Sequence, residues 1–123
     1  MATQGAQIRE TFVAGSDLRL AQFNFVSLAA DGAIDVTGAG LAADGVLIND
    51  PNTAEAATVV VFGRVTVELG TGGCTAGDLI ASDASGLAVT ATTSDIVLGK
   101  VLETGVAGQI VTMDFYKGGN AAA

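Results

Sequence analysis

Short apolar segments, each ended by a turn of small residues, fill the sequence between positions 70 and 115. Gly, Asp and Ser recur at the turns, in AGD at 76–78, SDASG at 82–86 and AGQ at 107–109. A helix in a globular protein usually needs about ten residues or more, and none fits between such turns. This half of the chain therefore predicts a compact set of short β-strands.

The same pattern extends toward the N-terminus. Strands are expected at 24–29, 33–37, 46–48, 58–69, 78–81, 87–90, 96–102 and 109–115. The longest, 58–69, starts with apolar residues on both faces and ends with polar residues on one, so it is expected to be buried on both sides only at its start. Gly63 in its middle predicts a bulge or a bend where the chain crosses between sheets. Residues 54–57 fit either one helical turn or extended chain.

A five-residue segment, Leu-Ala-Ala-Asp-Gly, occurs at 28–32 and again at 41–45. In both copies Asp-Gly stands between apolar segments, which predicts a hairpin turn because both residues accept a positive φ. Together these signals predict an all-β fold, a small antiparallel β-sandwich or a tulip-like β-barrel. We expect an extended N-terminal arm over 1–15, a single β domain over 16–117 and a flexible tail over 118–123.

The composition limits how stable such a domain is on its own. The chain has 123 residues, of which 50% are hydrophobic but only 5% aromatic, and 17 are Gly. Small side chains bury little apolar area, at about 25 cal/mol per Å². We therefore expect the protein to form an oligomer or to bind a larger surface.

The charge excludes one class of partner. Thirteen acidic and five basic residues give a net charge of −8, and the basic residues are dispersed along the sequence. Nucleic-acid binding needs clustered Lys and Arg, so no nucleic-acid partner is expected. No apolar stretch is long enough to span a bilayer and the N-terminus lacks a secretory signal, so we expect a soluble protein made in a cytoplasm, with no membrane partner.

Residues for catalysis are scarce. The sequence contains no His and a single cysteine, Cys74, which is expected to be buried. The serines lie in turns outside any G-x-S-x-G motif. Two pairs of acids, Asp31 with Asp35 and Asp78 with Asp83, are explained by turn formation. We expect no enzyme, no cofactor and no metal site.

The first fifteen residues contain three large apolar side chains, Ile8, Phe12 and Val13, among polar neighbours. They are too few to form a core. Two interpretations remain open: an arm that anchors on another protein, or a frayed terminus.

Three segments resemble the decoration (cement) proteins of tailed-bacteriophage capsids. They are GRVTVEL at 63–69, TAGDLIASDASGLAV at 75–89 and IVLGKVLETGVAGQIV at 96–111. The resemblance covers roughly positions 16 to 115 and depends on the order and spacing of these segments together.

The resemblance implies a structural protein without catalytic residues. Such a protein binds the outer surface of an expanded icosahedral phage head as a homotrimer and clamps neighbouring subunits of the major capsid protein. The N-terminal arm would contact the capsid through Ile8, Arg9, Phe12 and Val13. Removal of residues 1–13 is then expected to leave a folded protein that no longer decorates capsids.

Two other classes stay open. One is a non-catalytic β-sandwich module that binds a surface or a glycan, although Tyr116 is the only Tyr and there is no Trp to form a sugar platform. The other is a small hydrolase, which the missing His disfavours.

Overall fold

The computed structural model describes residues 7–116, and within this range the chain forms nine β-strands and no helix. The strands are β1 (Gln7–Ala14), β2 (Phe25–Leu28), β3 (Ala33–Val36), β4 (Gly45–Leu47), β5 (Ala56–Glu68), β6 (Leu79–Ser82), β7 (Ala88–Thr90), β8 (Gly99–Val101) and β9 (Ile110–Phe115). The all-β prediction is confirmed.

Five of the strands close on themselves. β1 pairs with both β3 and β5, β2 joins β3 to β4, and β4 returns to β5. This circuit is a small barrel. β1 runs parallel to β3, whereas every other strand pair is antiparallel. The sheet is therefore mixed and not purely antiparallel, because the β2–β3 hairpin places β3, and not β2, beside β1.

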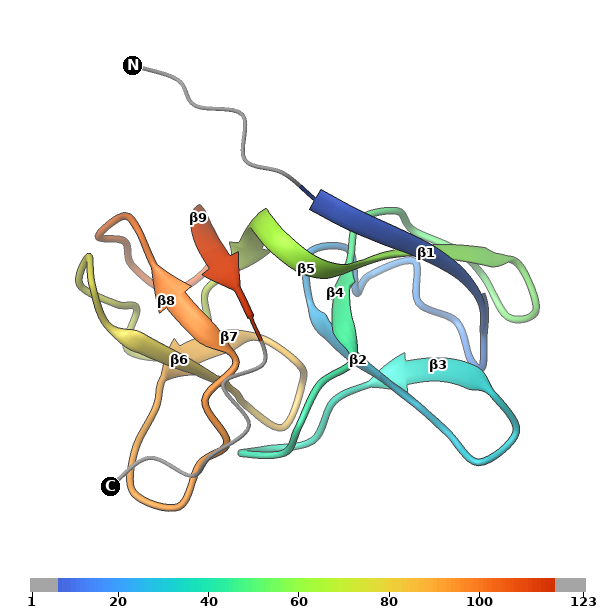
Figure 1. Cartoon of the computed structure of the whole chain (residues 1–123), viewed down its shortest axis with the longest axis horizontal. Helices are drawn as coiled ribbons and strands as arrows, with labels where there is room; N and C mark the ends of the chain where they lie inside the picture. The colour runs from blue at the N-terminus through green and yellow to red at the C-terminus, as the bar shows by residue number, and fades with distance from the viewer. Residues whose placement is uncertain (1–6, 117–123) are drawn as a thin grey trace.

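The remaining strands continue from the second half of β5. β9 pairs with this half of β5, and β8, β6 and β7 follow in that order. An isolated bridge between Leu69 and Ala88 brings β7 back to the end of β5. Figure 1 shows β1–β4 on one side of the molecule and β6–β9 on the other, with β5 running through both groups. The long strand thus belongs to both halves of the fold.

Gly63 marks the crossing point on β5, as expected. Its φ is 115°, a backbone conformation that residues with a side chain rarely adopt. Pairing with β1 ends at Gly63 and pairing with β9 begins there. A register shift opposite Ile8 and Arg9 leaves Val61 as an extra residue. The predicted bulge and bend are confirmed.

Two clusters of buried side chains lie on either side of β5. Val59 belongs to the cluster inside the N-terminal barrel, while its neighbour Val60 belongs to the larger C-terminal cluster. β5 is therefore buried on both faces at this point, as the sequence predicts. The larger cluster also holds Phe25 from β2 and Phe115 from β9, whose ring centroids are 6.1 Å apart. These two rings join the halves in one core.

Only one of the two Asp-Gly hairpins is present. The first copy forms the turn between β2 and β3, where the Gly32 amide donates to the Ala29 carbonyl. The second prediction is wrong, because Gly45 starts β4. A Cβ on Gly45 would lie 2.2 Å from Cγ1 of Val59, so glycine is needed there for the close approach of β4 to β5.

The N-terminal segment and one expected strand need separate description. Residues 7–14 form a strand that pairs with β5 along its length and with β3 at Val13 and Ala14. The strand expected at 96–102 begins at Gly99, because the Ile96 and Leu98 amides donate outside the ladder to Gly40 and Ile80. Residues 1–6 and the expected tail at 118–123 lie outside the described residues.

Candidate functional site

The four residues predicted to contact a capsid all lie on β1. Ile8 is paired with Phe62 of β5, and Arg9, Phe12 and Val13 follow along the same strand. Ile8 is 54% exposed and Val13 is 52% exposed, and Arg9 is also exposed. Phe12 is partly buried and packs against the N-terminal core cluster. The strand therefore offers Ile8, Arg9 and Val13 to a partner and uses Phe12 for packing.

The neighbours of β1 decide how it contacts another protein. Its backbone is hydrogen-bonded to β5 along seven residue pairs and to β3 at Val13 and Ala14. An edge strand would recruit a partner by strand addition. β1 is paired with β3 only at Val13 and Ala14, so over residues 7–12 its edge away from β5 has no strand partner among the described residues, and another protein can meet this edge as well as the exposed side chains.

Phe62 is an exposed aromatic residue that the sequence analysis did not single out. In a regular strand it would share a face with Val60, which is fully buried, yet 52% of Phe62 is exposed. The extra residue at Val61 and the bend at Gly63 turn this side chain outward beside Ile8. The two residues form an apolar pair at the surface. The sequence signal for this exposure is Gly63, which follows Phe62 and interrupts a run of β-branched residues.

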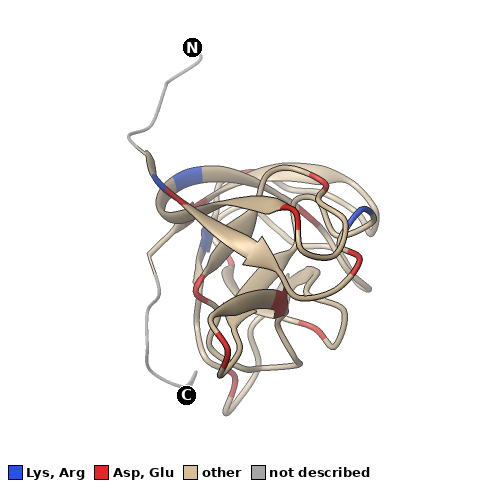
Figure 2. Ribbon diagram, turned by 90° about the vertical axis from the view of Figure 1, so that its right-hand side faces the viewer, with Lys and Arg blue, Asp and Glu red and all other residues tan. Residues whose placement is uncertain are grey.

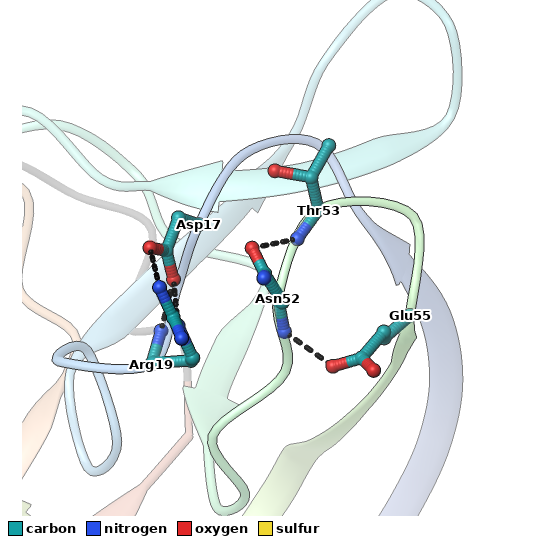
Figure 3. Close-up of polar contacts among 5 residues, drawn as sticks. All are labelled: Asp17, Arg19, Asn52, Thr53 and Glu55. Atoms are coloured by element: carbon teal, nitrogen blue, oxygen red, sulfur yellow. Dashed lines mark hydrogen bonds and ion pairs between the residues drawn. The ribbon is translucent and has the colours of Figure 1, made fainter.

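A second group of polar residues lies where two loops of the N-terminal barrel meet. Arg19 donates from Nε to Oδ1 of Asp17 at 2.9 Å and from Nη2 to Oδ2 at 2.8 Å. Nearby, the backbone amide of Asn52 donates to the Glu55 carboxylate, and the backbone amide of Thr53 donates to the side-chain oxygen of Asn52 (Figure 3). Arg19 lowers the pKa of Asp17 to about 2. These contacts shape the loops, and residues 52–55 form a turn before the extended chain of β5.

A shallow depression of about 480 Å³ lies beside these loops. Ser16, Asp17, Asn24, Asp35 and Ser85 are its polar lining residues. The Ser16 hydroxyl donates to Asp35, and the Asn24 side-chain amide donates to the Ser85 carbonyl at 3.2 Å. The depression thus has a hydroxyl beside a carboxylate, while its second carboxylate, Asp17, is ion-paired with Arg19.

Three of the four carboxylates considered as acid pairs serve turns, as the sequence predicts, whereas Asp35 lies on β3 and accepts from the Ser16 hydroxyl. Asp31 accepts from the Ala33 amide, and Asp83 accepts from the amides of Ser85 and Leu87. Asp78 accepts from the Thr75 amide and the Thr90 hydroxyl. Each of these three carboxylates is bonded to the backbone of its own turn, and Asp78 also to the adjacent strand.

Within residues 7–116, no three acidic, Cys or His side chains gather closely enough to hold a metal ion. Cys74 is buried, as predicted, and its thiol donates to the Glu103 carbonyl at 3.4 Å. Burial raises the pKa of this thiol, which lowers its reactivity. No helix in the described part of the chain is long and apolar enough to cross a membrane.

The chain is similar in fold to the N base of the head fiber gp8.5 of bacteriophage phi29. The two structures superpose with a TM-score of 0.73, and the match covers 91% of this chain and 96% of that chain at 20% sequence identity. The sequence itself matches no family model and no curated protein. The similarity shows a shared all-β fold over nearly the whole of both chains.

Proposed function

We propose that this protein is a non-catalytic structural component of a phage head, bound to the outer surface of the capsid. The observation that carries the proposal is the shared fold with a head fiber base over 91% of the chain. The resemblance of segments 63–69, 75–89 and 96–111 to capsid decoration proteins supports the same role independently. The major capsid protein is the proposed partner, and the virion surface is the proposed location.

The exposed side chains of β1 are the proposed contact with the capsid. Arg9 and Val13 lie on one face of the strand and Ile8 on the other, and Phe62 enlarges the apolar area beside Ile8. Exposed aromatic, aliphatic and Arg side chains are enriched where proteins bind each other. Phe12 supports this surface from beneath, through its contact with the N-terminal core.

We further propose that the protein acts as a homotrimer that clamps neighbouring capsid subunits. Three linked copies multiply weak contacts, because binding of the first copy raises the effective concentration of the others. Large apolar side chains remain exposed on the single chain, among them Leu20, Leu41 and Val106, which is consistent with further association.

The test is a density gradient of particles from the native source, probed with an antibody against this chain. Co-banding with DNA-filled heads, at a stoichiometry near that of the major capsid protein, is the expected result. A chain found only in the soluble fractions would overturn the proposal. The clamp is tested separately, by heating heads with and without the protein and measuring DNA release, which the protein is expected to delay.

A further inference from the structure

The shallow depression beside the loops of the N-terminal barrel lies where the two halves of the fold meet. Its walls come from the loop between β1 and β2, from Asp35 and Val36 on β3, and from Ser85 in the turn between β6 and β7. The Phe25 amide donates to the Gly86 carbonyl at 2.7 Å, which ties this turn to the start of β2. Ligand sites favour such junctions, and the volume of about 480 Å³ lies within their usual range of about 300–1,000 Å³.

One buried side chain in the wall carries an acceptor without a donor. Asn24 is 6% exposed, and its Nδ2 donates to the carbonyl of Ser85, another lining residue, at 3.2 Å. Its Oδ1 is buried and has no hydrogen-bond partner within residues 7–116. Exchanging the two amide atoms would only place the oxygen against a carbonyl oxygen. A buried acceptor without a donor destabilises the free protein, so a ligand that supplies the donor gains affinity from it.

The backbone next to Asn24 is strained. Phe23 has a φ of 70°, which bulky residues rarely adopt. Its amide donates to the Leu47 carbonyl at 2.6 Å and its carbonyl accepts from the Glu68 amide at 3.1 Å, so β4 and the end of β5 hold it in this conformation. Strained residues concentrate at binding sites. The strain and the unpaired acceptor lie at adjacent positions and indicate the same depression.

The carboxylates and the Ser16 hydroxyl of the lining are also acceptors. Ser16 uses its proton on Asp35, and no basic side chain in the described part of the chain forms an ion pair with Asp35. Asp17 accepts from Arg19 through both oxygens, so the two lining aspartates together with Arg19 carry a net charge of −1. Acidic residues are spread over many loops of the molecule (Figure 2), so the buried acceptor, and not the charge alone, distinguishes this place.

Apolar side chains form the rest of the depression. Leu18 and Ala21 are buried and Val36 is partly buried, whereas Leu20 is 97% exposed. Leu20 lies in an ordered turn, in which the Ala21 amide donates to the Leu18 carbonyl at 3.0 Å. Ca²⁺ needs about six to eight closely placed oxygens, which such a lining does not offer. A long side chain with a charged end matches acceptors beside apolar surface.

We propose that this depression binds the side chain of an arginine on a neighbouring protein. A guanidinium has five N–H donors in one plane, so it donates to Oδ1 of Asn24 and to Asp35 together, while its methylene stem packs on Leu18 and Val36. A protein is favoured over a free small cation because a protein surface also covers Leu20. The inference rests on the proposed function only in naming the capsid as the carrier of this arginine.

The first experiment titrates the full chain, labelled with ¹⁵N, with N-acetyl-arginine amide at constant ionic strength. We expect saturable shifts in the side-chain NH₂ signals of Asn24, with a Kd on the order of 1 mM. Asp35→Asn removes the charge but keeps an acceptor for Ser16, and is expected to weaken binding roughly tenfold. The matched control is Asp31→Asn, which makes the same charge change in the β2–β3 turn, outside the lining, and should bind like the wild type.

The second experiment sediments each chain with DNA-filled heads stripped of this protein and quantifies the bound fraction. Asp35→Asn is expected to lower the affinity for heads roughly tenfold, and Asp31→Asn to leave it unchanged. Leu20→Ala is expected to lower it about fivefold while binding N-acetyl-arginine amide like the wild type, because only a protein surface covers this side chain. Circular dichroism of the three variants should show unchanged folding.

Each result decides one step of the inference. Absence of saturable shifts, or an equal response of the same signals to N-acetyl-lysine amide or to calcium chloride, would overturn the guanidinium site. Probe binding combined with head binding that Asp35→Asn leaves unchanged would assign the depression to a free small cation and overturn the protein partner. Heads that bind no wild-type chain would overturn the proposed function, while a positive titration would still support the guanidinium site.

Discussion

Phe115 gives the sharpest test of how the two halves are held together. Its side chain is fully buried in the C-terminal core, and its ring lies 6.1 Å from that of Phe25, which comes from the N-terminal barrel. Truncation of a buried Phe to Ala typically costs about 3–5 kcal/mol, because apolar contacts are lost and a cavity remains. Since a domain of this size is stable by about 5–15 kcal/mol, Phe115→Ala is expected to remove about a fifth or more of its stability.

The assay is urea denaturation followed by two probes. Circular dichroism reports on all strands, while fluorescence of Tyr116, the only tyrosine, reports on the end of β9. Because both halves share β5, we expect the two transitions to coincide in the wild type and to move together in Phe115→Ala. The matched control is Phe62→Ala, which removes the same atoms from a side chain that is 52% exposed and is expected to cost less than about 1 kcal/mol.

A double-mutant cycle isolates the contact between the rings. Phe25→Leu and Phe115→Leu keep much of the buried volume, and their coupling energy is expected to be about 0.5–1.5 kcal/mol. Two results would refute the reasoning. One is a cost for Phe115→Ala as small as that for Phe62→Ala. The other is a Tyr116 transition that moves while the dichroism transition of the barrel stays in place.

Further predictions concern a close approach, a thiol, an ion pair and β1. Gly45→Ala places a Cβ 2.2 Å from Cγ1 of Val59 and 2.6 Å from a backbone oxygen, so we expect a loss of about 2 kcal/mol or more in urea denaturation; a loss below about 0.5 kcal/mol would contradict this. Cys74 is buried with a raised pKa, so DTNB at pH 8 should label it far more slowly in buffer than in urea, and equal rates would count against its burial. Arg19→Gln should return the pKa of Asp17 from about 2 toward 3.8, as measured by carboxyl ¹³C shifts, and an unchanged pKa would exclude Arg19 as the cause. In the wild type, the lowered pKa means that the contribution of Asp17 to stability is complete above pH 3.8 and is lost as the pH falls toward 2. Deletion of residues 1–14 removes the strand that pairs with β3 and β5, so the thermal transition seen by circular dichroism should be lost. A cooperative transition in the truncated chain would instead show that residues 1–14 are a separable arm.

The candidate surface was predictable only in part. Ile8, Arg9 and Val13 stand out in the sequence as apolar and positive residues in a polar segment, and the structure exposes all three. Phe62, by contrast, lies in an alternation that predicts burial, and its exposure depends on the bulge at Val61. The basic residues appear dispersed along the chain, and strand pairing alone brings Arg64 and Lys100 to either side of Asp114.

Local signals in the sequence therefore determined the existence of eight of the nine described strands, but not that residues 7–14 form one, nor that β8 starts only at Gly99. Turn residues every few positions ruled out helices, and the alternation around Gly63 predicted both the long strand and its bend. Identical local sequences did not determine their own role: Asp-Gly makes a hairpin at 31–32 and starts a strand at 44–45. Only the tertiary structure decided that difference, as it decided the pairing of β1 with β3 and β5 and the position of Arg64 and Lys100 on either side of Asp114. Each depends on hydrogen bonds between residues far apart in the chain, and short strands rich in Ala and Val carry too little information to specify their neighbours.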